Sequence, residues 1–186
     1  MVSKRIRFDW QRKLVLPVLV LGALVIAGFA SSASGPNAQL ASQNRVYGGG
    51  HFIVPDGTER NFAVDAHASG QAAFGDVEYA GISHWSHEQV LCVTVVGQRA
   101  TIGTVITKAD RRETIGMLTL FVLSDGGPPL SGTQDSSTFH IVGPANDPSW
   151  PGGFPNTCPT PEAATALYGL EAFSLDGGDV VVQNAK

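Results

Sequence analysis

The chain has 186 residues, with 12 Lys and Arg against 16 Asp and Glu and a formal net charge of −4. Residues 1–34 hold five of the basic groups and one of the acidic groups, so the rest of the chain carries 7 basic and 15 acidic groups, a net charge of −8. This acidic balance excludes nucleic acid and anionic membrane surfaces as expected partners. The remaining ~150 residues suffice for one domain with its own core.

The N-terminus has the three regions of a secretory signal. Basic residues open the chain, an uncharged apolar run extends from Leu14 to Phe29, and small residues follow. This order predicts a signal peptide over residues 1–34, cleaved after Ala30 or Ala33. The alternative is an uncleaved helix, anchored in the membrane by residues 14–33, with the domain outside. In both cases the predicted location of the domain is extracellular.

A flexible leader is predicted over 35–44 and a secreted β-domain over 45–186. Gly is abundant at 22 residues, and β-branched residues are frequent, which favours strands joined by tight turns. The first strand is expected to end near Val54 and to contain a glycine bulge at 48–50. A turn is expected at 55–58. Further strands are predicted over 61–66, 75–81, 89–96, 99–107, 117–123 and 138–142.

Two features stand out around the strongest predicted strand, 89–96. Gly97 and Gln98 form a two-residue connection with glycine first, which is typical of a β-hairpin.

The two cysteines are far apart in the sequence. Cys92 lies in the predicted strand 89–96, and Cys158 lies in a long Pro- and Gly-rich loop at 143–160. In an exported chain, an even pair of cysteines predicts a disulfide. It would close a loop of ~67 residues, worth at most ~4 kcal/mol in the chain-entropy description.

The C-terminal part is expected to contain a helical turn or a strand entry at 163–167. A closing hairpin is predicted after it, with Gly177 and Gly178 as its turn. No long helical period occurs after the signal. The predicted fold class is therefore all-β: a single β-sandwich or partly open barrel of about seven to nine antiparallel strands, preceded by the signal or anchor helix.

Turn and core segments carry a family resemblance. In chain order they are Tyr47–Gly50, Phe62–Asp65, Val77–Tyr79, Cys92–Gly103, Phe121–Pro128, Asp135, Phe139–Ile141 and Gly177–Val182. Their order resembles a small all-β domain that recurs in exported bacterial proteins of the actinobacterial type, alone or appended to larger surface proteins. The resemblance implies a secreted β-sandwich-like module for binding or structure. It supplies no catalytic residues, and the 143–160 loop departs from it.

Two groups of residues are candidates for metal binding. His84 and His87 flank Trp85 and stand beside a glutamate, a combination that could hold a divalent metal, although a solvated loop with Trp85 packed on the sheet is the preferred interpretation. Asp176 and Asp179 would face each other across the predicted Gly177-Gly178 turn. The default expectation is a hydrated turn in which water screens the two charges; the alternative is that they bind Ca²⁺ together with two further acids that bracket a Gly- and Pro-rich loop. Those two acids are Asp125 and Asp135.

No Gly-x-Ser-x-Gly, His-Glu-x-x-His or phosphate-binding glycine loop occurs, so no catalytic residue, cofactor or enzyme activity is predicted. The predicted function is a non-enzymatic extracellular binding or structural module that acts on an extracellular or cell-surface ligand. One alternative is a small secreted hydrolase centred on His84 and His87. Another is a Ca²⁺- or carbohydrate-binding module that uses Trp85 or Trp150 as a stacking platform.

Overall fold

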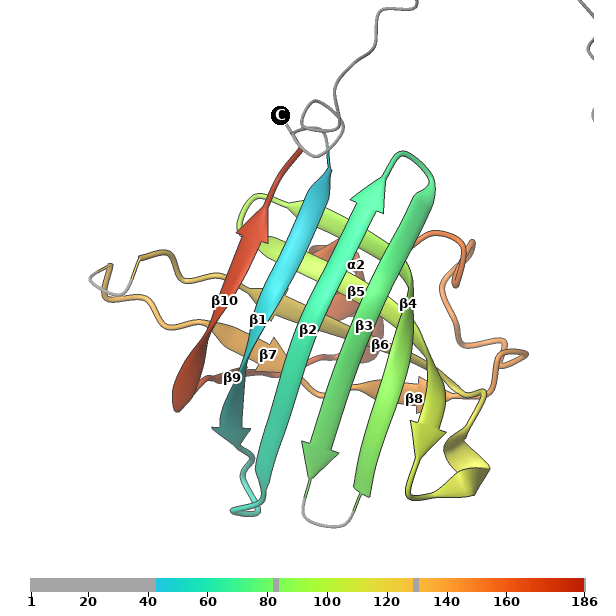
Figure 1. Ribbon diagram of the computed structural model, residues 1–186. Helices are drawn as coiled ribbons and strands as arrows, with labels where there is room; N and C mark the ends of the chain where they lie inside the picture. Colours follow the sequence, from blue (N-terminus) through green and yellow to red (C-terminus); the bar gives the residue numbers. More distant parts are fainter. Residues whose placement is uncertain (1–42, 82–83, 129–130, 186) are drawn as a thin grey trace, which may run out of the picture. The chain divides into compact units, whose positions relative to one another are not determined.

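The computed structural model describes residues 43–81, 84–128 and 131–185. The predicted signal and most of the leader lie outside these residues. The described chain is all-β, as predicted, with one short α-helix (Figure 1). Its strands are β1 (Asn44–Ile53), β2 (Glu59–Ser69), β3 (Ala72–Gly81), β4 (His84–Val96), β5 (Arg99–Ala109), β6 (Leu118–Ser124), β7 (Ser136–Thr138), β8 (Ile141–Gly143), β9 (Ala172–Ser174) and β10 (Gly177–Gln183).

The ten strands form a single antiparallel sheet that curls into a half-barrel (Figure 1). The strand order is β10-β1-β2-β3-β4-β5-β6-β7-β9, and β8 pairs with β6 beside β7. Of the two predicted architectures, the partly open barrel is therefore the one observed, with one more strand than the upper expectation. A sheet this wide curls because each strand is twisted relative to its neighbour, and the curl encloses the core without a second sheet.

Local turn chemistry agrees with the sequence predictions. β4 and β5 are joined by Gly97 and Gln98, with Val96 opposite Arg99 and Gly97 at φ 61°. The turn at 55–58 also forms, because the Thr58 amide donates to Asp56 Oδ1 at 2.8 Å. These turns depend on a few adjacent residues, so the sequence is sufficient to predict them.

Two predictions about glycines are wrong. The register of β1 against β2 is continuous from Asn44 to Ile53, so the glycines at 48–50 form no bulge. Gly48 instead allows the backbones of β1 and β10 to approach closely, since a Cβ at this position would lie 2.1 Å from the backbone oxygen of Asp179. The predicted closing hairpin is also absent, because β9 pairs with β7 whereas β10 pairs with β1. Gly177 and Gly178 therefore lie inside β10.

A second layer covers the convex face of β5 and β6. It contains α2 (Pro161–Tyr168) and the loop before it, so the helical alternative for 163–167 is the observed one. Thr160 caps the helix by accepting from the Ala163 amide, and Pro161 occupies its first turn. Leu120 and Val122 of β6 pack against Ala164 and Leu170 in this layer.

The predicted disulfide forms and fixes this layer to the sheet. The Cα atoms of Cys92 and Cys158 are 5.4 Å apart, within the range for a disulfide. Thr94 Oγ1 also donates to the Cys158 carbonyl at 2.9 Å. A disulfide is compatible with an extracellular domain. Among the described residues, none of the helices has the length and apolar character needed to cross a membrane.

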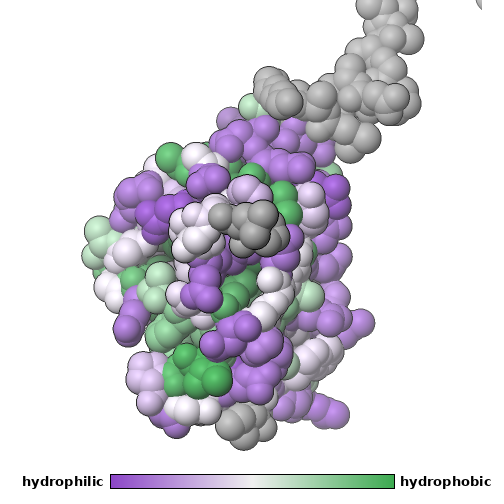
Figure 2. Space-filling model, turned by 90° about the vertical axis from the view of Figure 1, so that its left-hand side faces the viewer, coloured by the Kyte–Doolittle hydropathy of each residue, from purple (hydrophilic) through white to green (hydrophobic). Residues whose placement is uncertain are grey.

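The main core fills the concave side of the sheet. It contains, among others, Val46, Phe52, Phe62, Val64, Val77, Ile102, Phe121, Leu123 and Val180, each at most 6% exposed. Full burial of a side chain of this size is worth about 1.5–3 kcal/mol. On the face seen in Figure 2, hydrophilic side chains gather at the top and along one side, and apolar side chains lie in the centre and the lower part.

Candidate functional site

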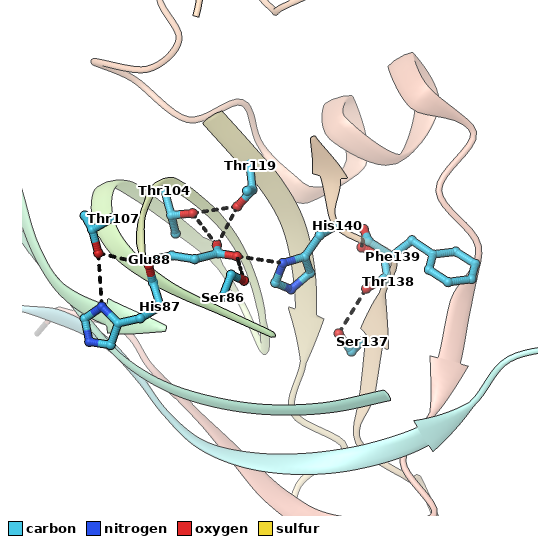
Figure 3. Close-up of polar contacts among 10 residues, drawn as sticks. All are labelled: Ser86, His87, Glu88, Thr104, Thr107, Thr119, Ser137, Thr138, Phe139 and His140. Atoms are coloured by element: carbon cyan, nitrogen blue, oxygen red, sulfur yellow. Dashed lines mark hydrogen bonds and ion pairs between the residues drawn. The ribbon is translucent and has the colours of Figure 1, made fainter. Parts of the chain in front are cut away.

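A charged side chain lies inside the concave core. Glu88 of β4 is 1% exposed, and three hydroxyl groups donate to its carboxylate (Figure 3). Ser86 Oγ donates to Oε1 at 2.8 Å, while the hydroxyls of Thr104 and Thr119 donate to Oε2 at 2.5 and 2.8 Å. Thr104 and Thr119 are direct partners across β5 and β6. A buried carboxylate needs this degree of hydrogen bonding to remain ionised.

The direction of the Glu88 side chain follows from a bulge in β4. Val90 pairs with Thr104 and Cys92 with Gly103, so Leu91 is an extra residue in the strand. Before the bulge, Glu88 and Val90 face the concave core. After it, Cys92 faces the outer layer and forms the disulfide. The bulge thus lets one strand supply both the internal carboxylate and the external cysteine.

His140 approaches Glu88 from the opposite wall. Its Nδ1 lies 3.7 Å from Glu88 Oε1, a distance that fits an ion pair and is too long for a hydrogen bond. The ring lies between Phe121 and Tyr79, with centroid separations of 3.9 and 4.0 Å. The side chain is 4% exposed, and neither ring nitrogen has a hydrogen-bond partner in the part of the chain that the structure describes.

His140 faces inward because the chain is irregular between β7 and β8. Ser137 pairs with Leu123, and Ile141 pairs with Leu120. The segment from Ser137 to Ile141 therefore contains one residue more than the stretch of β6 that it follows. The extra residue interrupts the single strand predicted over 138–142. Thr138 Oγ1 accepts from the Val122 amide at 3.0 Å and so replaces a backbone partner at the interruption.

The electrostatics of the site reflect burial and the cationic neighbours. Burial acts to raise the pKa of Glu88, but His140 and the surrounding hydroxyls outweigh it and lower the pKa to about 2. Burial raises the pKa of Tyr79 to about 12, so its phenol stays neutral. Burial and the nearby Arg60 and Arg111 lower the pKa of His84. The site therefore holds an ionised carboxylate and a neutral phenol at neutral pH.

These groups line a cavity of about 350 Å³. Its lining includes residues at the start of β2, the end of β3 and the start of β4. These ends of the three strands lie at the lower end of the sheet in Figure 1. Glu88, His140 and Tyr79 form its inner part, and Trp85, Phe139 and Val142 supply partly exposed apolar walls. A cavity with apolar walls and a few convergent polar groups is the usual form of a small-molecule site.

The edge of the cavity carries basic side chains. Arg60, Arg111 and His84 line it, together with the carboxylate of Asp110. Arg60 and His84 converge over Gly81, because a Cβ at Gly81 would lie 2.0 Å from Arg60 Nη1 and 3.1 Å from His84 Cε1. The absence of a side chain at Gly81 therefore leaves room for both groups at the cavity.

A larger hollow of about 650 Å³ lies beside the disulfide, between Ala68–Ala73, Leu91–Thr94 and Asn156–Cys158. No charged side chain lines it. Volume alone would favour this hollow, but it lacks the buried charge and the unpartnered imidazole that distinguish the cavity at Glu88. We therefore take the smaller cavity as the candidate site.

His84 and His87 do not share a site. Both lie in β4, which begins at His84, so the predicted loop at 84–88 is wrong. His84 lines the cavity, whereas His87 lies outside its lining. His87 contacts Thr107 Oγ1 at 3.1 Å and Asp76 Oδ1 at 3.6 Å. The predicted hydrolase centre required these two histidines to converge, and they do not.

Asp125 and Asp135 connect the loop after β6 to the edge of β10. Asp125 accepts from the amides of Gly127 and Val182 at 2.6 and 3.0 Å. Asp135 accepts from the amides of Gly126 and Val180 at 2.7 and 2.6 Å. These hydrogen bonds satisfy the outer edge of a strand that pairs only with β1. Both carboxylates thus have a structural role in closing the half-barrel.

The other two candidate acids are not brought together as predicted. Asp176 accepts from the Ile53 amide at 3.1 Å, and Asp179 lies exposed in β10. They do not face each other across a turn, because the predicted hairpin does not form. Over residues 43–81, 84–128 and 131–185, no three His, Cys, Asp or Glu side chains are grouped as a metal site requires.

The two candidate stacking tryptophans also differ. Trp85 is 39% exposed and lines the cavity. Trp150 packs against Phe154 and Tyr168, and its Nε1 donates to the Pro144 carbonyl at 2.8 Å. Only Trp85 is therefore placed to contact a ligand in the cavity.

Sequence reasoning includes Glu88 only as a neighbour of His84 and His87 in a loop, and it misses His140, Thr104 and Thr119. The polar segment from Ser86 to Gln89 has no apolar alternation, so its strand conformation and the burial of Glu88 are visible only in the structure. No local pattern marks His140, because its role depends on the irregularity between β7 and β8.

Comparisons with protein-family models, with curated proteins and with solved structures give no match for this chain. The resemblance to the exported bacterial domain therefore stays a prediction, and a function must be argued from the geometry of the site.

Proposed function

We propose that this chain is an exported ligand-binding protein that holds a small molecule in the cavity between β3, β4 and the β7–β8 segment. The observation that carries the proposal is His140, whose buried imidazole lines the cavity and has no hydrogen-bond partner among the described residues. Leaving buried polar atoms unsatisfied costs about 1–3 kcal/mol each, and a bound ligand would supply a partner. The predicted N-terminal signal and the disulfide support export.

The arrangement favours binding over catalysis. Glu88 already accepts three hydroxyl hydrogen bonds, and its low pKa makes it a poor proton acceptor. His84, the other titratable histidine in the lining, is separated from His87 as described above. The apolar walls at Trp85, Phe139 and Val142 suit recognition of a ligand with an apolar body.

The test is binding of N-phenyl-1-naphthylamine, a neutral probe that fluoresces in apolar surroundings. The purified protein should bind it, and Val142→Trp should weaken binding at least tenfold because a larger side chain fills the mouth of the cavity. Val96→Trp is the matched control, since Val96 is similarly exposed at 44% and lies outside the cavity lining. Absence of binding, or equal binding by both variants, would count against the proposal.

A further inference from the structure

The cavity has unused donors, whereas both of its carboxylates already accept hydrogen bonds. Glu88 accepts three hydroxyls, and Asp110 Oδ1 accepts from the amides of Trp85 and Arg111 at 3.0 and 2.8 Å. In contrast, neither the Arg60 guanidinium nor the Tyr79 hydroxyl has a hydrogen-bond partner within the described parts of the chain. A ligand that completes these groups must supply acceptor atoms.

Arg60 favours a ligand whose acceptor atoms carry a negative charge. Its guanidinium is the group in the lining best suited to a carboxylate, because its planar array of N–H donors matches the two carboxylate oxygens. His84 lies beside it over Gly81 and can add an N–H donor. Two carboxylates, Glu88 and Asp110, also line the cavity and balance Arg60 and Arg111 in formal charge. The preference for an anion therefore rests on the unpaired donor array of Arg60, and not on a positive charge of the lining as a whole.

The apolar walls define the other end of the ligand. Trp85, Phe139 and Val142 are 39, 36 and 47% exposed, and all three line the cavity. Exposed apolar side chains that border a cavity are typical of surfaces that become covered on binding. A cavity of about 350 Å³ suits a small organic molecule and is too small for a polymer segment with a bulky backbone.

We infer that the ligand is a small amphipathic organic acid whose carboxylate binds Arg60 and His84 and whose apolar body packs against Trp85 and Phe139. This inference rests on the proposed function and specifies the ligand class. Tyr79 and His140 form the deeper polar surface, where the phenol can donate to a further oxygen of the ligand.

The experiment compares three ligands of one shape by calorimetric titration of the purified protein: 2-naphthoate, 2-naphthamide and 2-naphthylmethylammonium. We expect naphthoate to bind at least tenfold more tightly than the neutral amide and the ammonium to bind most weakly. Arg60→Gln should weaken naphthoate binding tenfold or more and leave the amide nearly unchanged, because the lost contact is a charge-assisted hydrogen bond.

The matched control is Arg112→Gln, which makes the same charge change at an exposed arginine outside the lining. It should bind naphthoate as the wild type does. Binding of N-phenyl-1-naphthylamine by Arg60→Gln reports that this variant still folds. The inference is overturned if naphthoate and naphthamide bind equally, if the ammonium binds best, or if the two arginine variants behave alike. If the naphthylamine probe binds and naphthoate does not, only the ligand class is wrong; if neither binds, the proposed function fails as well.

Discussion

Glu88 shows how the chemistry of one residue depends on its surroundings. An isolated carboxylate would not stay ionised in an apolar core, because burial penalises the charged form. Here the hydroxyls of Ser86, Thr104 and Thr119 and the imidazole of His140 stabilise it. The ionised carboxylate in turn holds the imidazole at the inner surface of the cavity. Glu88 is thus a positioning residue for the proposed site.

The first residue-scale prediction concerns Glu88→Gln. We expect its free energy of unfolding at pH 7 to fall by about 2–4 kcal/mol, because the amide accepts the three hydroxyl hydrogen bonds only in part and lacks the carboxylate charge that they stabilise. The pKa of Glu88 is lowered to about 2 in the folded protein, below the ordinary 4.5. Its contribution to stability is therefore complete above pH 4.5 and is lost as the pH falls toward 2.

Chemical denaturation at several pH values measures this effect. Between pH 4.5 and 2, the wild type should lose more stability than Glu88→Gln, so their curves should converge. Glu78→Gln is the control, because it removes the same charge from an exposed position in β3. Parallel pH curves for the wild type and Glu88→Gln would contradict the assignment.

At the scale of the strands, two irregularities in the pairing and one sheet edge determine where the important side chains point. The bulge at Leu91 and the extra residue between β7 and β8 direct side chains that a regular strand would send to the other face. The edge of β10 is satisfied by two aspartates from a loop, with no neighbouring strand on that side. At the free edge of β10, aspartate side chains thus accept the hydrogen bonds that a neighbouring strand would otherwise accept.

The element-scale prediction is that Asp135→Asn loosens the edge of β10. An amide nitrogen directed at the Val180 amide cannot accept its proton, so we expect a loss of about 1–2 kcal/mol in unfolding free energy. Hydrogen exchange at the Val180 amide should accelerate. Asp179→Asn makes the same charge change within β10 itself, where the side chain makes no hydrogen bond to a described residue, and should leave both quantities unchanged. Equal effects of the two variants would rule out this role.

At the scale of the molecule, the Cys92–Cys158 disulfide joins the sheet to the outer layer of α2 and its preceding loop. The concave core holds the sheet together, and the outer layer of α2 and the 144–160 loop is fixed by the disulfide and by contacts such as Arg99 with Glu162 at 3.0 Å. The ion pair is exposed and contributes little. The disulfide is therefore the principal restraint on the outer layer besides its apolar packing.

The molecular-scale prediction follows from the 66-residue separation of the two cysteines. Replacing both Cys92 and Cys158 by Ser should lower the free energy of unfolding by up to about 4 kcal/mol, because the unfolded chain regains its conformational freedom. Guanidinium unfolding with and without reductant measures it. Reductant should bring the wild type to the stability of the double variant and should not affect the variant itself. A wild type that is insensitive to reductant would contradict this restraint.

The sequence by itself was sufficient for the all-β class, the Gly97-Gln98 hairpin, the turn at 55–58 and the cysteine pair. Each depends on strand periodicity, on a few adjacent residues or on a pair that exported proteins oxidise. Only the tertiary structure decided that β10 pairs with β1 instead of β9, and that His140 meets Glu88. Those outcomes depend on the curl of the whole sheet and on two irregularities in its register, because a one-residue shift exchanges the faces of a strand.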